Sequence, residues 1–253
     1  MAHRRTTRHA PARRDASALV VYGLNAVLEL LRGDEPVTRL YLGQGPREAE
    51  IDALAAARGI PVERADRGML EQVAGSSSHQ GAVAVAPPFR YEPLERLLEP
   101  GRPSVLVVDG IQDPRNLGAI LRTARAAGVG GVVLPRDRSA GITPVVVATS
   151  AGLLFGLPVA QVPNLVRAME ALKSAGFWIV GLIPRGGQSV FAFTPPNRPA
   201  VVVGGEGEGL RSLVVRHCDF TVTIPMAPRV ESLNVSVATG IALYEMLVRQ
   251  TVP

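Results

Sequence analysis

Four short segments in the second half of the chain are apolar at almost every position instead of at alternate positions. They are residues 105–109, 131–134, 177–180 and 200–203. A strand with one solvated face alternates apolar and polar side chains, so a continuous apolar run indicates a strand covered on both faces. Segments with helical spacing lie between or after these strands, at about 117–127, 163–175 and 233–249. This alternation predicts a parallel α/β sheet in a domain of residues 104–253.

A smaller alternating pattern precedes this domain. Helices are expected at 22–32, 47–58 and 67–74, and short strands at 38–42, 61–64 and 82–86. These elements form a compact α/β domain over residues 18–87. Several prolines punctuate residues 88–103, a composition that suits a semi-rigid linker better than a core element.

Charge is distributed unevenly along the chain. Residues 1–14 contain five arginines and no acid, whereas residues 15–100 hold 8 basic and 13 acidic residues and residues 101–253 hold 14 and 9. We interpret residues 1–17 as a disordered basic tail that could engage phosphates, although its start is superficially like an organellar transit peptide. The domain of residues 18–87 therefore lies in the acidic part of the chain.

The remaining composition excludes several classes of protein. With 47% hydrophobic and 19% charged residues the chain is not disordered, and no run approaches the roughly 20 apolar residues of a membrane helix. The single cysteine, Cys218, excludes an intramolecular disulfide and points to a reducing compartment, so we expect a cytoplasmic protein. The four histidines are too scattered to form a zinc site with it.

Three polar or glycine-rich segments follow apolar strands, where open α/β sheets place their ligands. In the first, at 109–125, Asn116 is a plausible helix cap, and Arg115 and Arg122 fall on nearly the same helix face. Arginines on one face aim planar donors at phosphate. The alternative for such a pair is an ordinary solvated helix face.

The second segment, at 203–210, is rich in glycine but does not fit a dinucleotide fingerprint. Leu210 stands where the last glycine would be needed, and Glu206 and Glu208 would repel a pyrophosphate. Its glycines could let backbone groups meet an uncharged adenosine or amino-acid moiety. A simple turn is the alternative.

The third segment, at 224–246, gathers side chains of different chemistry at a loop-to-helix junction. They are Met226, Arg229, Glu231, Ser232 and Asn234. Ser232 or Asn234 could merely cap the last helix. Loops on a rigid scaffold are, however, where binding and catalytic sites are built.

Together the three segments resemble the SpoU class of RNA ribose 2′-O-methyltransferases in the SPOUT superfamily. Residues 113–118 with Arg122 are similar to the family's first motif, residues 204–210 to its second, and residues 224–226 with 232–238 to its third. The N-terminal domain resembles the family's ribosomal-protein-like substrate-binding domain, including residues 79–81 before its last strand.

The resemblance implies a cofactor, a topology and partners. S-adenosylmethionine would bind in a bend of the chain within a deep trefoil knot of the C-terminal domain, the chain would form a homodimer, and its substrate would be RNA. The cofactor-binding residues implied are Gly204, Gly205, Ile224, Met226 and Leu233.

The resemblance also assigns a catalytic group. It consists of Arg122, Asn116, Glu206, Ser232 and Asn234. Arg122 is a poor general base because guanidinium keeps its proton up to about pH 12. We expect it to bind the adjacent phosphate and stabilise the developing alkoxide, leaving the proton to phosphate, water or Glu206. No metal is implied.

The chain as a whole is most like members that act on a guanosine of 23S-type ribosomal RNA. Two positions depart from those members: Phe155 stands where a glutamate is common, and Pro228 where glycine is favoured. We interpret Phe155 as a residue that fills core. A transfer-RNA ribose methyltransferase and a non-catalytic RNA-binding or ribosome-assembly module are the alternatives.

Overall fold

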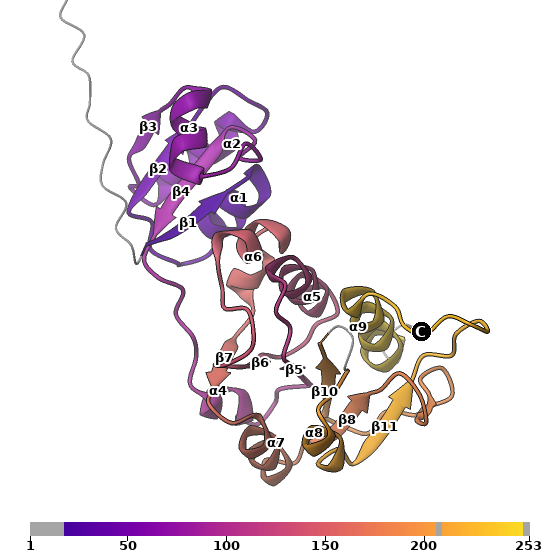
Figure 1. Ribbon diagram of the computed structural model, residues 1–253. Coiled ribbons are helices and arrows are strands. Elements are labelled where there is room, and N and C mark those ends of the chain that lie inside the picture. The colour runs from indigo at the N-terminus through magenta and orange to yellow at the C-terminus, as the bar shows by residue number, and fades with distance from the viewer. Residues whose placement is uncertain (1–17, 206–208, 250–253) are drawn as a thin grey trace, which may run out of the picture.

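The computed structural model describes residues 18–205 and 209–249 (Figure 1). The basic tail therefore lies outside the described residues. Two sheets organise the chain, a four-stranded one near the N-terminus and a seven-stranded one in the larger second part. The predicted arrangement of a small α/β unit followed by a larger α/β sheet is the one found.

The N-terminal sheet has the strand order β1-β4-β2-β3. Strands β1 and β2 each pair antiparallel with β4, and β2 pairs parallel with β3. Strand β1 was not predicted from the sequence, where the first expected element was a helix that begins at residue 22. The elements are β1 (Leu19–Tyr22), α1 (Leu24–Arg32), β2 (Arg39–Leu42), α2 (Glu48–Ala57), β3 (Val62–Arg64), α3 (Arg67–Ala74) and β4 (Ala82–Ala86).

The second sheet has the order β7-β6-β5-β10-β8-β11-β9, and every neighbouring pair is parallel. The parallel sheet predicted from continuous apolar strands is thus confirmed. Its strands are β5 (Val105–Asp109), β6 (Val132–Pro135), β7 (Val159–Val162), β8 (Trp178–Leu182), β9 (Gln188–Ser189), β10 (Pro199–Gly204) and β11 (Phe220–Thr223). Its helices are α4 (Leu94–Leu98), α5 (Pro114–Ala126), α6 (Pro144–Thr149), the 3-10 helix η1 (Leu153–Gly156), α7 (Leu165–Ser174), α8 (Ser212–Arg216) and α9 (Val235–Leu243), which continues into a π-helical turn at Tyr244–Val248.

Helices cover both faces of this sheet, which explains the apolar strands. Along β5, Leu106 and Val108 belong to the core shared with α5, α6 and α9, whereas Val105 and Val107 belong to the core shared with α4 and α7. Figure 1 shows α5 and α6 on one side of the strands and α4 and α7 on the other. Successive side chains point to opposite faces, so both faces must be apolar.

The segment assigned to a linker contributes more to the core than its prolines suggested. Residues 94–98 form α4, which begins after Pro93, and Leu97 is fully buried. The backbone N–H of Glu92 donates to the carbonyl of Val159 at 2.8 Å. The expectation of no core element in residues 88–103 is therefore wrong at α4, because proline is well tolerated where a helix begins.

The two parts of the chain share one continuous apolar core. It includes Leu30 of α1 and Ala84 of β4 together with Leu121 of α5. Gly152 sits at this junction with φ of 80°, and an added Cβ would lie 2.8 Å from the Cα of Ala26. Only glycine allows that approach.

Phe155 packs at this same junction. It is partly buried on η1 against the shared core, which is the structural role that we expected for it.

None of the helices in residues 18–205 and 209–249 is both long enough and apolar enough to cross a membrane.

Candidate active site

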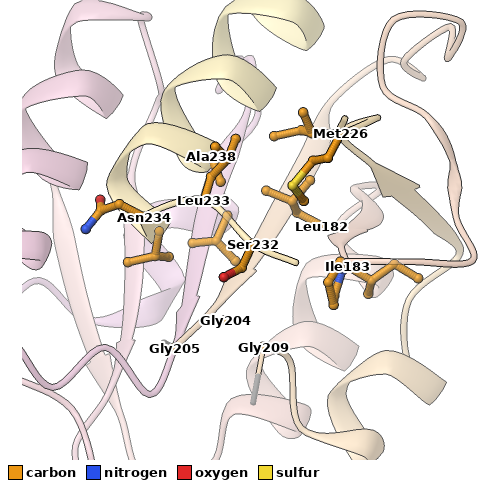
Figure 2. A pocket seen from close by; sticks show the side chains of 14 residues that line it. Leu182, Ile183, Gly204, Gly205, Gly209, Met226, Ser232, Leu233, Asn234 and Ala238 are labelled. Carbon is orange, nitrogen blue, oxygen red and sulfur yellow. The ribbon is translucent and has the colours of Figure 1, made fainter. Parts of the chain in front are cut away.

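A cavity of about 350 Å³ opens at the carboxyl ends of β8, β10 and β11 (Figure 2). Leu182 and Gly204 are the last residues of β8 and β10, and Ile224 follows β11 directly. Parallel strands place their carboxyl ends at one edge of a sheet, where open α/β folds bind ligands. Ser232 and Asn234 line this cavity. So do all five residues expected to bind the cofactor, which are Gly204, Gly205, Ile224, Met226 and Leu233.

Two glycines form one wall of the cavity because the backbone leaves no room for a side chain. A Cβ on Gly204 would lie 2.2 Å from the carbonyl carbon of Gly209, and a Cβ on Gly205 would lie 2.7 Å from the carbonyl oxygen of Gly110. Gly205 and Gly209 form an isolated antiparallel bridge. The chain thus turns back on itself and presents bare backbone to the cavity, whereas the predicted Glu206 lies outside the described residues.

The opposite wall is apolar. Figure 2 shows Met226 and Leu182 across the cavity from Leu233 and Ala238, with Ser232 near the glycines. Such a cavity, with apolar walls, exposed backbone and a few polar side chains, suits an uncharged group that has hydrogen-bonding edges.

A pair of asparagines joins the first and third motifs. Nδ2 of Asn234 donates to Oδ1 of Asn116 at 3.0 Å, although the two residues are 118 positions apart. Asn234 also caps α9, because its Oδ1 accepts from the backbone N–H of Ser236 at 2.9 Å. The predicted capping role of Asn234 is therefore confirmed.

Asn116 itself is not a helix cap. Asp113 is the N-cap of α5, and its carboxylate accepts from the backbone N–H of Arg115. Asn116 is the third residue of the helix, within its first turn, and is buried, with 9% of its surface exposed. The cap prediction failed because Pro114 fills the first helical position, which proline favours, so the helix starts earlier.

Arg122 lies on the same helix as Asn116 but does not line the cavity. Its side chain is exposed, and it has no hydrogen-bond or ion-pair partner among residues 18–205 and 209–249. Ser232 and Asn234 therefore line the cavity, Asn116 is joined to it through its hydrogen bond to Asn234, and Arg122 lies at the surface of α5.

An ion pair between a buried aspartate and a half-exposed arginine holds the chain beside the glycine wall, and the sequence analysis did not include it. Asp109, the last residue of β5, is 2% exposed, and its Oδ1 lies 2.6 Å from Nη2 of Arg211. Its Oδ2 accepts from the backbone N–H of Arg211 at 3.1 Å. The sequence did offer one signal for this pair, a single acidic residue at the end of an apolar strand. This pair fixes the chain after Gly209 to the end of β5.

Three more cavity residues carried no polar signal in the sequence. Leu182, Ile183 and Pro184 follow one another at the end of β8. Only the rule that ligands bind at the carboxyl ends of parallel strands could have pointed to them.

Two family models cover most of the chain. The model described as the SpoU rRNA Methylase family matches residues 103–244, and the model described as RNA 2'-O ribose methyltransferase substrate binding matches residues 20–92.

Individual proteins agree with these matches. The chain is 43% identical over 234 residues to a protein of Xanthomonas campestris named 23S rRNA (guanosine-2'-O-)-methyltransferase RlmB, covering 89% of this chain and 94% of that protein. It is 41% identical over 238 residues to an uncharacterized tRNA/rRNA methyltransferase of Synechocystis, covering 90% of this chain but spanning only 62% of that protein.

A solved structure shows the same fold. The crystal structure of an AdoMet-bound rRNA methyltransferase from Sinorhizobium meliloti matches with a TM-score of 0.80 at 26% identity, covering 94% of this chain and 89% of that one. The resemblance seen in the three motifs is thereby confirmed: the chain belongs to the SpoU rRNA methylase family.

Proposed function

We propose that this protein methylates a ribose 2′-hydroxyl in RNA with S-adenosylmethionine as methyl donor, and that its target is a guanosine of 23S-type ribosomal RNA. The observation that carries the proposal is the cavity itself, where all three motifs meet through the Asn116–Asn234 hydrogen bond. The names of the Xanthomonas relative and of the Sinorhizobium structure support the reaction and the RNA class.

The residues present fit S-adenosylmethionine. Gly204 and Gly205 pack directly against the backbone of Gly209 and Gly110, so the wall that they form is bare backbone, which polar edges of an adenosine could reach. Leu182, Ile224 and Met226 supply apolar walls that exclude water. Ser232 and Asn234 would orient the ribose or the methionine end of the cofactor. The chemistry supplied by S-adenosylmethionine when bound is an electrophilic methyl group on a positively charged sulfur.

The protein must also position the hydroxyl and manage one proton from a weak acid. A guanidinium group is a cation and not a base, and the exposed side chain of Arg122 is available to hold the phosphate beside the target ribose. That charge would stabilise the developing alkoxide. The proton would pass to phosphate, to water or to Glu206.

Ribosomal RNA is preferred over transfer RNA because the likeness to the Xanthomonas protein runs through both parts of the chain. The Synechocystis relative, whose name leaves tRNA and rRNA open, keeps the transfer-RNA alternative in the test. A non-catalytic RNA-binding module is disfavoured by the intact glycine wall and polar pair of the cavity.

Three features of architecture belong to this proposal. The domains are residues 18–87 for RNA binding and 104–253 for catalysis. The bend around Gly204 and Leu233 is part of a deep trefoil knot, a proposal that the insertion of β10 between β5 and β8 supports. The chain forms a homodimer through α9 and the residues that flank it, since three apolar side chains of this segment are well exposed in the monomer: Leu233 at 38%, Val237 at 52% and Tyr244 at 47%.

The test is methylation of unmodified 23S rRNA made by transcription, with radiolabelled S-adenosylmethionine and mapping of the modified ribose. Transfer RNA is the parallel substrate. Arg122→Ala should abolish transfer while sparing cofactor binding. Replacement of another exposed arginine, Arg167→Ala on α7, should leave transfer unchanged. Full activity of Arg122→Ala would overturn its assignment. Methylation of transfer RNA alone would overturn the substrate.

A further inference from the structure

The N-terminal domain has a cavity of its own, of about 880 Å³, far along the chain from the methyl-donor cavity. It lies where β2 and β3 end and where β4 begins, which is one edge of the four-stranded sheet. We call it the N-terminal pocket and define it by Gln44, Arg64, Arg67, Leu70, Ser77 and His79. Its size is within the range of sites that bind small organic groups, about 300–1,000 Å³.

A buried histidine in this pocket has a hydrogen-bond donor without an acceptor. His79 is 5% exposed, and its Nδ1 accepts from the backbone N–H of Gly81 at 3.1 Å. Because Nδ1 is an acceptor, the neutral ring carries its proton on Nε2. Nε2 is buried and has no partner among residues 18–205 and 209–249. A buried donor without an acceptor is unfavourable, so the site favours a ligand that brings an acceptor.

The charges around the pocket do not suit a bare phosphate. Arg64 is paired with Glu48 and Asp52 at 2.8 and 2.7 Å, and Arg67 is paired with Glu71 at 2.9 Å. The rim cations are thus already neutralised by carboxylates. Phosphate sites, by contrast, offer several unpaired donors.

The remaining walls suit a flat, uncharged group with polar edges. Leu42 and Leu70 are buried apolar residues, and the Gln44 amide is exposed at the opening. Gln80 holds the loop in place, because its Oε1 accepts from the backbone N–H of Leu24 at 3.2 Å. Proteins read unstacked RNA bases by stacking them on aromatic or guanidinium planes and by hydrogen-bonding to their edges, and this pocket has both arginine and amide side chains in its lining.

We propose that the N-terminal pocket binds an unpaired nucleobase of the RNA substrate, with Nε2 of His79 donating to a ring nitrogen or carbonyl of that base. This inference rests on the proposed function, because it assumes an RNA substrate. It accounts for an RNA-binding part of the chain that has more acids than bases: residues 15–100 would contribute base recognition, while phosphate attraction comes from elsewhere.

The test compares two substitutions in the loop before His79. Ser77 and Ser78 are both exposed, but only Ser77 lines the pocket. Ser77→Trp should therefore block the pocket and weaken binding of unmodified 23S rRNA at least tenfold, whereas Ser78→Trp should bind as the wild type does. Because no phosphate contact is lost, Ser77→Trp should leave the salt dependence of binding unchanged. Calorimetry should find the same affinity for S-adenosylmethionine in both variants.

A second pair of variants addresses the histidine directly. His79→Phe removes the donor and should weaken RNA binding, and His79→Gln, which restores an amide N–H, should recover part of the loss. Their urea midpoints show whether the domain still folds. Equal RNA affinities for Ser77→Trp and Ser78→Trp, or no binding of 23S rRNA by the wild type, would overturn the pocket assignment. A wild type that binds RNA through the pocket but methylates nothing would overturn the proposed function alone.

Discussion

The hydrogen bond between Asn116 and Asn234 offers the sharpest test of how the site is held together. Asn234 has two separable roles, since its Oδ1 caps α9 and its Nδ2 donates to Asn116. Asn234→Ser keeps an oxygen able to cap and loses the bridging donor. Asn234→Ala loses both. Asn116→Ala removes the acceptor of the bridge.

The magnitudes follow from the burial of the pair. A side-chain hydrogen bond contributes about 1 kcal/mol to the free energy of unfolding. A lost asparagine cap costs about another 1 kcal/mol. We therefore expect Asn234→Ser to destabilise by about 1 kcal/mol and Asn234→Ala by about 2 kcal/mol. In a double-mutant cycle of Asn116→Ala with Asn234→Ser, the coupling energy should be about 1 kcal/mol.

The assay is urea unfolding of the full chain, combined with calorimetry of S-adenosylmethionine binding. Loosening the bridge frees the loop that carries Ser232 and Leu233, so cofactor affinity should fall by about fivefold for each kcal/mol of ordering lost. A coupling energy near zero would refute the idea that this bond ties the first motif to the third. Equal destabilisation by Asn234→Ser and Asn234→Ala would refute the separation of cap and bridge.

Three further predictions concern the glycine wall, the cysteine and the N-terminus. Gly204→Ala should abolish S-adenosylmethionine binding in calorimetry, because its Cβ would lie 2.2 Å from the carbonyl carbon of Gly209. An unchanged affinity would contradict the role of the glycine wall in cofactor binding. Burial raises the pKa of Cys218 from 9.0 to about 11, so between these pH values the unfolded thiol ionises first and the free energy of unfolding should fall as pH rises. In urea unfolding between pH 9 and 11, the free energy of unfolding of Cys218→Ala should decline less with pH than that of the wild type. The same decline in both proteins would show that ionisation of Cys218 is not its cause. Deleting residues 1–14, which contain five arginines, should weaken RNA binding and reduce its salt dependence without affecting cofactor affinity. An unchanged salt dependence would show that these residues do not contact RNA phosphates.

Much of the cavity could be predicted because parallel strands bring distant motifs to one edge. Gly204, Ile224 and Leu233 each follow or flank an apolar strand or helix whose period is clear in the sequence. Their convergence follows from sheet geometry. The Asn116–Asn234 bond could not be predicted in the same way, because it depends on how α5 and α9 pack and not on the period of either helix.

The elements that were missed have physical reasons as well. Strand β1 runs directly into α1 with only Gly23 between them, so the apolar pattern changes period without a turn cluster to mark the boundary. Helix α4 is five residues long, too short for a periodic signal, and lies among prolines. In both cases tertiary packing, at Val21 and Leu97, decides the local structure.

The close contact of Gly152 with Ala26 has a consequence for the distance between the two cavities. Because α1 and η1 pack in one shared core, we expect this contact to fix the spacing between the N-terminal pocket and the methyl-donor cavity. An RNA that engages both must present an unpaired base and a reactive ribose at that same spacing. Selectivity would then reside partly in the tertiary shape of the RNA, and a substitution such as Gly152→Ala, remote from either cavity lining, would change which ribose is within reach.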